Sequence, residues 1–142
     1  MDQLIEDVMT SFPKVIDADR PLTEAAAVMR DADVGDVIVL AGGTLHGILT
    51  DRDIAVRAVA AGRVPSETSV RDICTTNVAV LSPDDTVGDA VRLMREHDVR
   101  RLPVMVDGQP IGMVSLGDLP AVEGAAGSVL ADLSAAPPDS SR

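Results

Sequence analysis

The sequence predicts an α/β (α+β) fold in which two β-α-β-β-α repeats pack with pseudo-two-fold symmetry. Three observations support this prediction. The chain matches itself at an offset of 65 positions, each copy carries an amphipathic helical stretch, and each copy carries two short apolar runs joined by a glycine-containing turn. A chain of 142 residues can bury roughly 70% of its surface on folding, which is enough for a substantial apolar core.

The internal repeat covers most of the chain. Residues 4–54 align with residues 69–119 without a gap. Between 15 and 54, eleven of forty positions are identical to their counterparts, whereas about three or four are expected by chance. The identical positions are Val15, Asp19, Ala25, Met29, Arg30, Asp33, Val34, Val39, Gly43, Gly47 and Asp53. We therefore expect repeat 1 at 4–61, a linker at 62–68, repeat 2 at 69–121, and a weak C-terminal helix with a flexible tail at 122–142.

The first half of each copy predicts a lead-in, a strand and a helix. The lead-ins at 4–9 and 70–74 are short and amphipathic, and extended segments follow near 15–16 and 78–81. A helix then begins after Pro21 or Thr86, because apolar residues recur there at i, i+3, i+4 and i+7. These residues are Leu22, Ala25, Ala26 and Met29 in the first copy, and Val87, Ala90, Val91 and Met94 in the second.

The second half of each copy predicts a β-hairpin and another helix. Runs 37–40 and 45–49 flank a Gly-Gly pair, and runs 102–106 and 111–114 flank an Asp-Gly pair. Both pairs supply the positive φ angles that tight hairpin turns need. A helix follows Thr50, continuing to Gly62, and another follows Ser115, where Pro120 stops it within one turn.

Composition excludes several classes of function. Twelve basic against 23 acidic residues give a net charge of −11, which repels nucleic acid and anionic membrane surfaces. No apolar run approaches the ~20 residues of a membrane span. From the charge and the lack of such a run we expect a cytoplasmic protein with neither nucleic acid nor membrane as a partner. Cys74 cannot pair within the chain, and two histidines with one cysteine are too few for most metal sites. No nucleophile and base stand at a known catalytic spacing, so we expect no enzyme and no required cofactor.

Several motifs resemble a known family. The stretches GILTDRD at 47–53 and GMVSLGD at 112–118, DICT at 72–75, and HDVRRLPV at 97–104 look like tandem cystathionine β-synthase (CBS) domains, a pair called a Bateman module. The resemblance covers residues 4–119, as in stand-alone two-repeat members. It implies a non-enzymatic regulatory module that binds AMP, ADP, ATP or, in some members, S-adenosylmethionine or a dinucleotide in clefts between the repeats. It also implies a homodimer, and such a module can act on a protein partner.

The resemblance assigns site residues in both copies. Asp53 and Asp118 would bind the ribose hydroxyls, in keeping with the ability of one carboxylate to accept two hydroxyl protons. Thr50 and Ser115 would stand at helix N-termini, where N–H groups favour a phosphate. Generic aliphatic side chains would line the adenine pocket; these are Val78, Val80 and Ile111. The same Thr/Ser-x-x-Asp pattern is also a helix N-cap that needs no ligand, and both roles can coexist.

The two copies differ in the cations they offer to a phosphate. Family members often carry phosphate-binding cations where Arg100 and Arg101 stand, whereas the aligned residues of the first copy are Gly35 and Asp36. We therefore expect unequal sites: phosphates near the arginines, and a first-copy site that is weak, empty or suited to an uncharged nucleoside. The alternative is that the arginines pair with acids such as Glu96 or Asp98 on an exposed edge.

Two other functions stay open beside the ligand sensor. A structural homodimeric interaction module with no physiological nucleotide would persist as a dimer and gain no stability from any adenosine compound. An enzyme would turn over a nucleotide. A sensor would be stabilised by its ligand.

Overall fold

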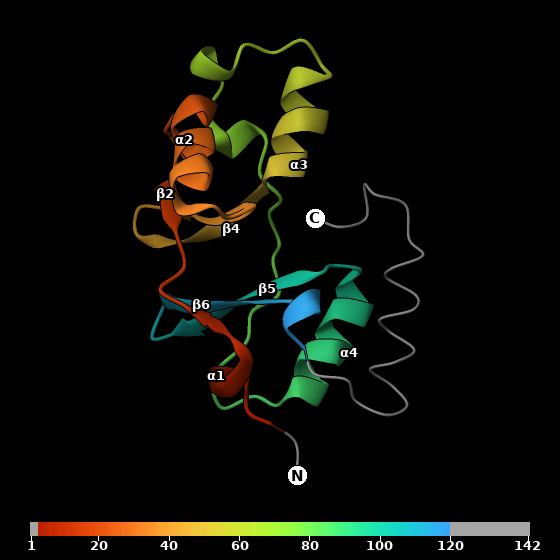
Figure 1. The fold of residues 1–142 in the computed structure, drawn as a ribbon. Helices are drawn as coiled ribbons and strands as arrows, with labels where there is room; N and C mark the ends of the chain where they lie inside the picture. The colour runs from red at the N-terminus through yellow and green to blue at the C-terminus, as the bar shows by residue number, and fades with distance from the viewer. Residues whose placement is uncertain (1–2, 120–142) are drawn as a thin grey trace. The chain divides into compact units, whose positions relative to one another are not determined.

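The computed structural model describes residues 3–119, which form two compact units (Figure 1). We call residues 13–78 the repeat-1 unit, and residues 3–12 together with 79–119 the repeat-2 unit. Each unit contains a three-stranded sheet and helices in the order β-α-β-β, so the predicted mixed fold class is confirmed. The closing helix and tail expected over 122–142 lie outside the described residues.

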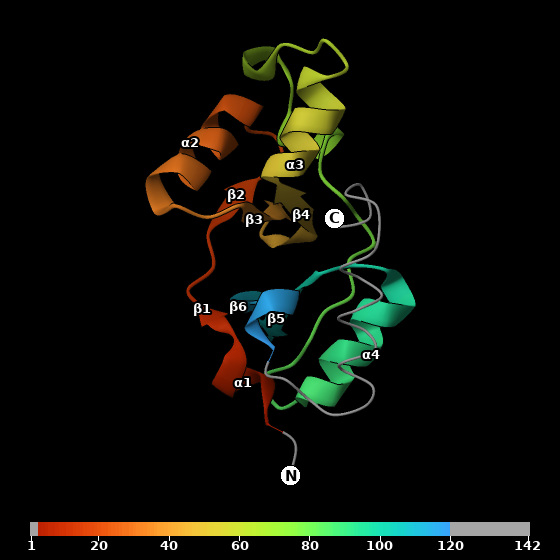
Figure 2. The ribbon, with the colours of Figure 1, turned by 45° about the vertical axis from the view of Figure 1, so that its right-hand side comes forward.

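The repeat-1 unit has a sheet of order β2-β3-β4, with β2 parallel and β4 antiparallel to β3. Its elements are β2 (Val15–Asp17), α2 (Leu22–Ala32), β3 (Asp36–Ala41), β4 (Thr44–Thr50), α3 (Asp51–Asp53), a π-helix (Ile54–Val59), and 3₁₀ turns at Pro65–Glu67 and Val70–Asp72. Figures 1 and 2 show α2 and α3 on the same face of this sheet. That face carries the core: Ile16, Ala18, Leu22, Ala25, Met29, Val37, Val39, Leu49, Ala58, Val70, Ile73 and Cys74.

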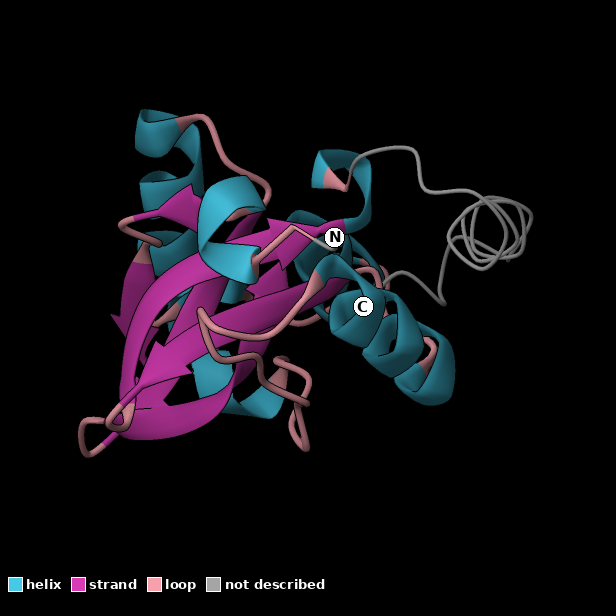
Figure 3. Cartoon of the chain, turned by 90° about the horizontal axis from the view of Figure 1, so that it is seen from below, coloured by secondary structure: helices cyan, strands magenta, loops and turns pink. Residues whose placement is uncertain are grey.

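The repeat-2 unit has a sheet of order β1-β6-β5, in which both pairings are antiparallel. Its elements are α1 (Ile5–Val8), β1 (Thr10–Ser11), α4 (Val87–His97), β5 (Arg101–Val106), β6 (Gln109–Ser115) and a 3₁₀ turn (Leu116–Asp118). Helices and strands are distinguished by colour in Figure 3. The core comprises Ile5, Leu81, Val87, Ala90, Val91, Met94, Leu102, Val104, Val114, Leu116 and Leu119.

The lead-in of each repeat completes the sheet of the other repeat's unit. Thr10 pairs with Met113 on β6, and Thr75, which stands 65 positions later, pairs with Ile48 on β4. The backbone hydrogen bonds repeat in the same way: the Ile5 N–H donates to the Asp85 carbonyl (2.8 Å), and the equivalent Val70 N–H donates to the Arg20 carbonyl (2.9 Å). A single repeat therefore lacks one border of its own sheet.

The helix predicted after Thr50 forms but changes its winding. Three α-helical residues lead into the π-helix, and Gly62 follows with φ of 76°. In the second copy only a 3₁₀ turn follows Ser115 before Leu119, as the early proline predicts. Of the extended segment expected at 78–81, Leu81 alone makes a β-bridge, to Val104.

The predicted hairpin turns are confirmed. The two central residues of each turn have positive φ: Gly42 and Gly43 in the first copy, Asp107 and Gly108 in the second. Within residues 3–119 no helix combines the length and apolarity of a membrane span.

Candidate functional site

The turn after β4 is held by a reciprocal cap between Thr50 and Asp53. The Asp53 N–H donates to Thr50 Oγ1 (3.0 Å), and the Thr50 N–H donates to Asp53 Oδ2 (3.0 Å). Both residues are buried, with 2% of Thr50 and 5% of Asp53 exposed. The structural role that the sequence pattern allowed is therefore present, and Oδ2 of Asp53 is engaged by the chain itself.

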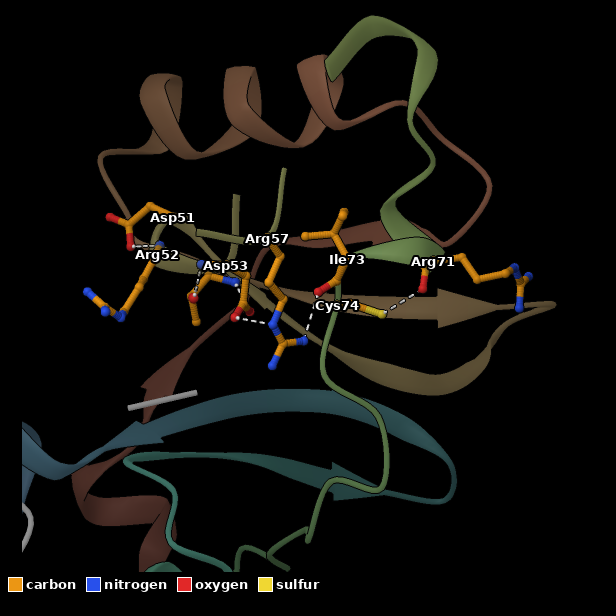
Figure 4. Close-up of polar contacts among 8 residues, drawn as sticks. Asp51, Arg52, Asp53, Arg57, Arg71, Ile73 and Cys74 are labelled. Carbon is orange, nitrogen blue, oxygen red and sulfur yellow. Dashed lines mark hydrogen bonds and ion pairs between the residues drawn. The ribbon is translucent and has the colours of Figure 1, made fainter. Parts of the chain in front are cut away.

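The second carboxylate oxygen of Asp53 faces an arginine on the π-helix (Figure 4). Arg57 Nε lies 3.8 Å from Asp53 Oδ1, and Arg57 Nη1 donates to the Ile73 carbonyl oxygen (3.1 Å). One guanidinium thus links the capped turn to the lead-in of repeat 2. Arg57 is not among the site residues predicted from the sequence, although the i, i+4 spacing of an acid and a base on a helix could have indicated it.

Cys74 lies beside the same cluster. Burial raises the pKa of its thiol above the ordinary value, and the negative charge of Asp53 raises it further. The sulfhydryl contacts the Arg71 carbonyl oxygen (Sγ to O, 3.7 Å), and 8% of the residue is exposed (Figure 4). Cys74 is therefore a buried thiol whose surroundings favour the neutral form.

The turn after β6 carries the equivalent acid in a more open position. Asp118 is exposed, and its Oδ2 accepts hydrogen bonds from the Ser115 hydroxyl (2.8 Å) and the Ser115 N–H (3.2 Å). Its Oδ1 accepts no hydrogen bond from any residue between 3 and 119. Asp118 is therefore oriented by Ser115, and residues 3–119 leave its second carboxylate oxygen available as an acceptor.

Arg100 and Arg101 lie at the same end of the sheet as Ser115. Arg101 is the first residue of β5 and pairs with Ser115, while the Leu116 N–H donates to the Arg100 carbonyl (2.8 Å). Glu96, one of the alternative partners considered above, lies 3.8 Å from Arg92. The repeat-2 unit thus brings two cations, a hydroxyl and a carboxylate to one sheet edge.

The corresponding edge of the repeat-1 unit has the opposite charge. Asp36 pairs with Thr50 in the sheet, and the Asp51 N–H donates to the Gly35 carbonyl (2.9 Å). The backbone therefore matches that of the repeat-2 unit, with Gly35 and Asp36 in place of the two arginines. The inequality of the two sites that this difference in charge predicts stays a prediction.

The residues predicted to line an adenine pocket are divided between the units. Val78 is half-buried in the repeat-1 unit. Val80 is 43% exposed in the repeat-2 unit, and Ile111 packs on the core of that unit. Each unit thus contains a capped acid and at least one of these aliphatic residues.

A family comparison matches both repeats. The CBS domain model matches residues 5–59 and 70–120. The chain therefore belongs to the CBS-domain family. CBS-domain pairs are commonly regulatory, and stand-alone members are typically not enzymes.

Relatives of similar length support this assignment. The CBS domain-containing protein YhcV of Bacillus subtilis is 37% identical over 115 residues, which are 81% of each chain. Hypoxic response protein 1 of Mycobacterium tuberculosis is 30% identical over 114 residues, 80% of each chain. A crystal structure of Hypoxic Response Protein I with two coordinated zinc ions has a TM-score of 0.73 at 29% identity, covering 82% of this chain and 95% of that one. A CBS-domain protein from Agrobacterium tumefaciens has a TM-score of 0.72 at 27% identity, covering 84% and 92%.

Proposed function

We propose that this chain is a regulatory module that binds an adenosine-containing ligand of the AMP, ADP or ATP class through the turns that follow β4 and β6. The observation that carries the proposal is the state of Asp118. Its carboxylate is exposed, Ser115 holds one oxygen in place, and the other oxygen is available among the described residues. A fixed carboxylate with an available oxygen is suited to accept the hydroxyls of a ribose.

Charge at the same edge favours a phosphorylated ligand. Arg100 and Arg101 precede and begin β5 next to Ser115, and guanidinium groups bind phosphate oxygens well. The chain as a whole is strongly acidic, with a net charge of −11, so a local pair of cations is needed to attract an anion. The proposed ligand therefore combines a ribose diol with at least one phosphate.

Zinc is not part of this proposal. A related structure contains two coordinated zinc ions. In residues 3–119 of the present chain, no three His, Cys, Asp or Glu side chains are grouped so that they could hold a metal ion.

A second candidate, a homodimeric interaction module without a nucleotide, is favoured by a separate observation. Val56 and Val59 on the π-helix are 45% and 61% exposed, and Val64 beyond it is 51% exposed. Residues 54–61 contain no acid, so two copies could meet there without strong charge repulsion. This surface is compatible with the sensor as well, because a dimer can also bind ligand.

Calorimetric titration with AMP, ADP, ATP, adenosine and S-adenosylmethionine tests the proposal. We expect at least one phosphorylated compound to bind, and to stabilise the fold by about 2.7 kcal/mol at a hundredfold excess over Kd. Asp118→Ala should weaken binding at least tenfold, whereas Asp84→Ala, which removes another exposed acid of the same unit, should not. The absence of binding by all five compounds at millimolar concentration, with a dimer in sedimentation, would favour the interaction module.

A further inference from the structure

The repeat-1 unit contains a cation beside its ribose-type acid, although the positions equivalent to the paired arginines are Gly35 and Asp36. This cation is Arg57, one helical turn beyond Asp53. We propose that Arg57 determines specificity at Asp53, so that the repeat-1 unit prefers a phosphorylated adenosine ligand to the neutral nucleoside. This inference rests on the proposed function and changes the ligand expected for the first copy.

The contact between Arg57 and Asp53 leaves Oδ1 of Asp53 without a hydrogen bond from the guanidinium. The separation of 3.8 Å between Nε and Oδ1 exceeds the 2.7–3.2 Å of an N–H···O hydrogen bond. Arg57 therefore offsets the charge of Asp53 without occupying the lone pairs of Oδ1. A ribose hydroxyl could approach that oxygen to about 2.7 Å while the guanidinium stays beside it.

Exposure makes the cation the more accessible member of the pair. The Arg57 side chain is 39% exposed, whereas that of Asp53 is 6% exposed. An approaching anion therefore meets the guanidinium more readily than the carboxylate. In the described part of the chain Nη2 of Arg57 makes no hydrogen bond, so it can donate to a phosphate oxygen.

The position of Arg57 is fixed by a second contact. Nη1 donates to the Ile73 carbonyl oxygen (3.1 Å), on the lead-in segment whose neighbour Cys74 is buried (Figure 4). A side chain held by one hydrogen bond at Nη1, and attracted by the charge of Asp53 beside Nε, loses less entropy on meeting a phosphate than a free arginine would. Arg57 is therefore a cation whose position is set by one hydrogen bond and one ion pair within its own unit.

The charges around Asp53 explain why a neutral ligand would gain less affinity from Arg57 than a phosphorylated one. Asp51, Asp53 and Asp36 all lie around this turn, and without a cation they would repel a phosphate. A unit charge about 4 Å from a phosphate is worth roughly tenfold in affinity at an effective dielectric of about 60, as for a partly exposed pair. Loss of Arg57 should therefore weaken the binding of AMP by about tenfold and leave the affinity for adenosine nearly unchanged.

The test isolates the Asp53 site in an Asp118→Ala background and compares AMP with adenosine by calorimetry. We expect AMP to bind about tenfold more tightly than adenosine in that background. Adding Arg57→Leu should reduce the ratio to near one, while Arg57→Lys, which keeps the charge, should retain most of it. Arg63→Leu is the matched control, because Arg63 pairs with Asp72 (3.5 Å) rather than with Asp53, and it should leave the ratio unchanged.

Each outcome decides the inference. The inference is overturned, while the proposed function stands, if Arg57→Leu weakens the binding of AMP and of adenosine equally. It is also overturned if AMP and adenosine bind with equal affinity before Arg57 is changed. Absence of binding in the Asp118→Ala background, when the unmodified chain binds AMP, overturns it as well. Failure of the unmodified chain to bind any adenosine compound overturns both. If Arg57→Leu does not fold by circular dichroism, Arg57→Gln replaces it with the same expected ratio.

Discussion

Gly47→Ala tests whether the lead-in of repeat 2 closes against β4 as tightly as the structure shows. A Cβ atom at position 47 would stand 2.2 Å from the Thr75 carbonyl oxygen and 3.1 Å from its carbon. Relief of this overlap needs a shift of about 1 Å, since carbon and oxygen atoms rarely approach within about 3.2 Å. Because the Thr75 atoms are backbone, no rotamer change can provide that shift.

The expected cost follows from the two hydrogen bonds at this crossing. The Ile48 N–H donates to the Thr75 carbonyl (3.0 Å), and the Thr75 N–H donates to the Ile48 carbonyl (2.9 Å). Losing both hydrogen bonds lowers the free energy of unfolding by about 1–3 kcal/mol, and partial exposure of Ile73 lowers it further. We therefore expect Gly47→Ala to destabilise the fold by about 2–4 kcal/mol. Chemical denaturation followed by circular dichroism measures this difference in the free energy of unfolding.

Two further glycines provide the controls. Gly117→Ala meets nothing within 4 Å and should be neutral or stabilising by up to about 1 kcal/mol. In Gly112→Ala the new Cβ atom would stand 2.4 Å from Sδ of Met9, which is a flexible side chain, and 3.1 Å from the Thr10 carbonyl oxygen. The loss of stability in this variant should therefore lie between those of the other two glycine variants. A Gly47→Ala chain that is as stable as the unmodified protein would refute the close approach, because without an overlap this exchange is usually stabilising.

Three other predictions concern individual groups. The raised pKa of the Cys74 thiol means that the fold favours its neutral form. The contribution of this neutral thiol to the stability of the fold is present at neutral pH and is lost as the pH rises above 9.0. Iodoacetamide should therefore label the folded chain more slowly than the unfolded chain at pH 8. The backbone N–H of Thr86 donates to Asp89 Oδ2 (2.9 Å) and lowers the pKa of this carboxyl, so the contribution of the carboxylate to stability is present above pH 3.8 and is lost at lower pH; Asp89→Ala should cost about 1 kcal/mol at pH 7 and less at pH 3 in urea titrations. Asp53→Ala should cost about 1–2 kcal/mol and Asp118→Ala less than about 0.5 kcal/mol, because only the first acid is buried; equal costs would contradict the difference between the two turns.

The sequence predicts the local elements well, because their causes are local. The helices Leu22–Ala32 and Val87–His97 follow from apolar spacing, and the two hairpins follow from residue pairs that tolerate positive φ. The capped acids also follow from a four-residue pattern, and the structure shows the cap at both Thr50 and Ser115.

Long-range features could not be predicted in this way. The periodicity of residues 70–74 indicates an amphipathic segment but does not say which sheet it joins, and the structure places it on the sheet of the other repeat. The π-helix at Ile54–Val59 could not be predicted either, because its sequence carries no local pattern that distinguishes it from an α-helix. The link from Arg57 to the Ile73 carbonyl spans 16 positions and has no local pattern.

A crystal structure of the chain grown with AMP is the most direct test of ligand binding at the turn after β6. We predict electron density for a ribose whose hydroxyls lie within about 2.5–3.0 Å of the Asp118 carboxylate. A nucleotide bound with its ribose away from both Asp118 and Asp53, or no nucleotide at saturating AMP, would contradict the proposed function.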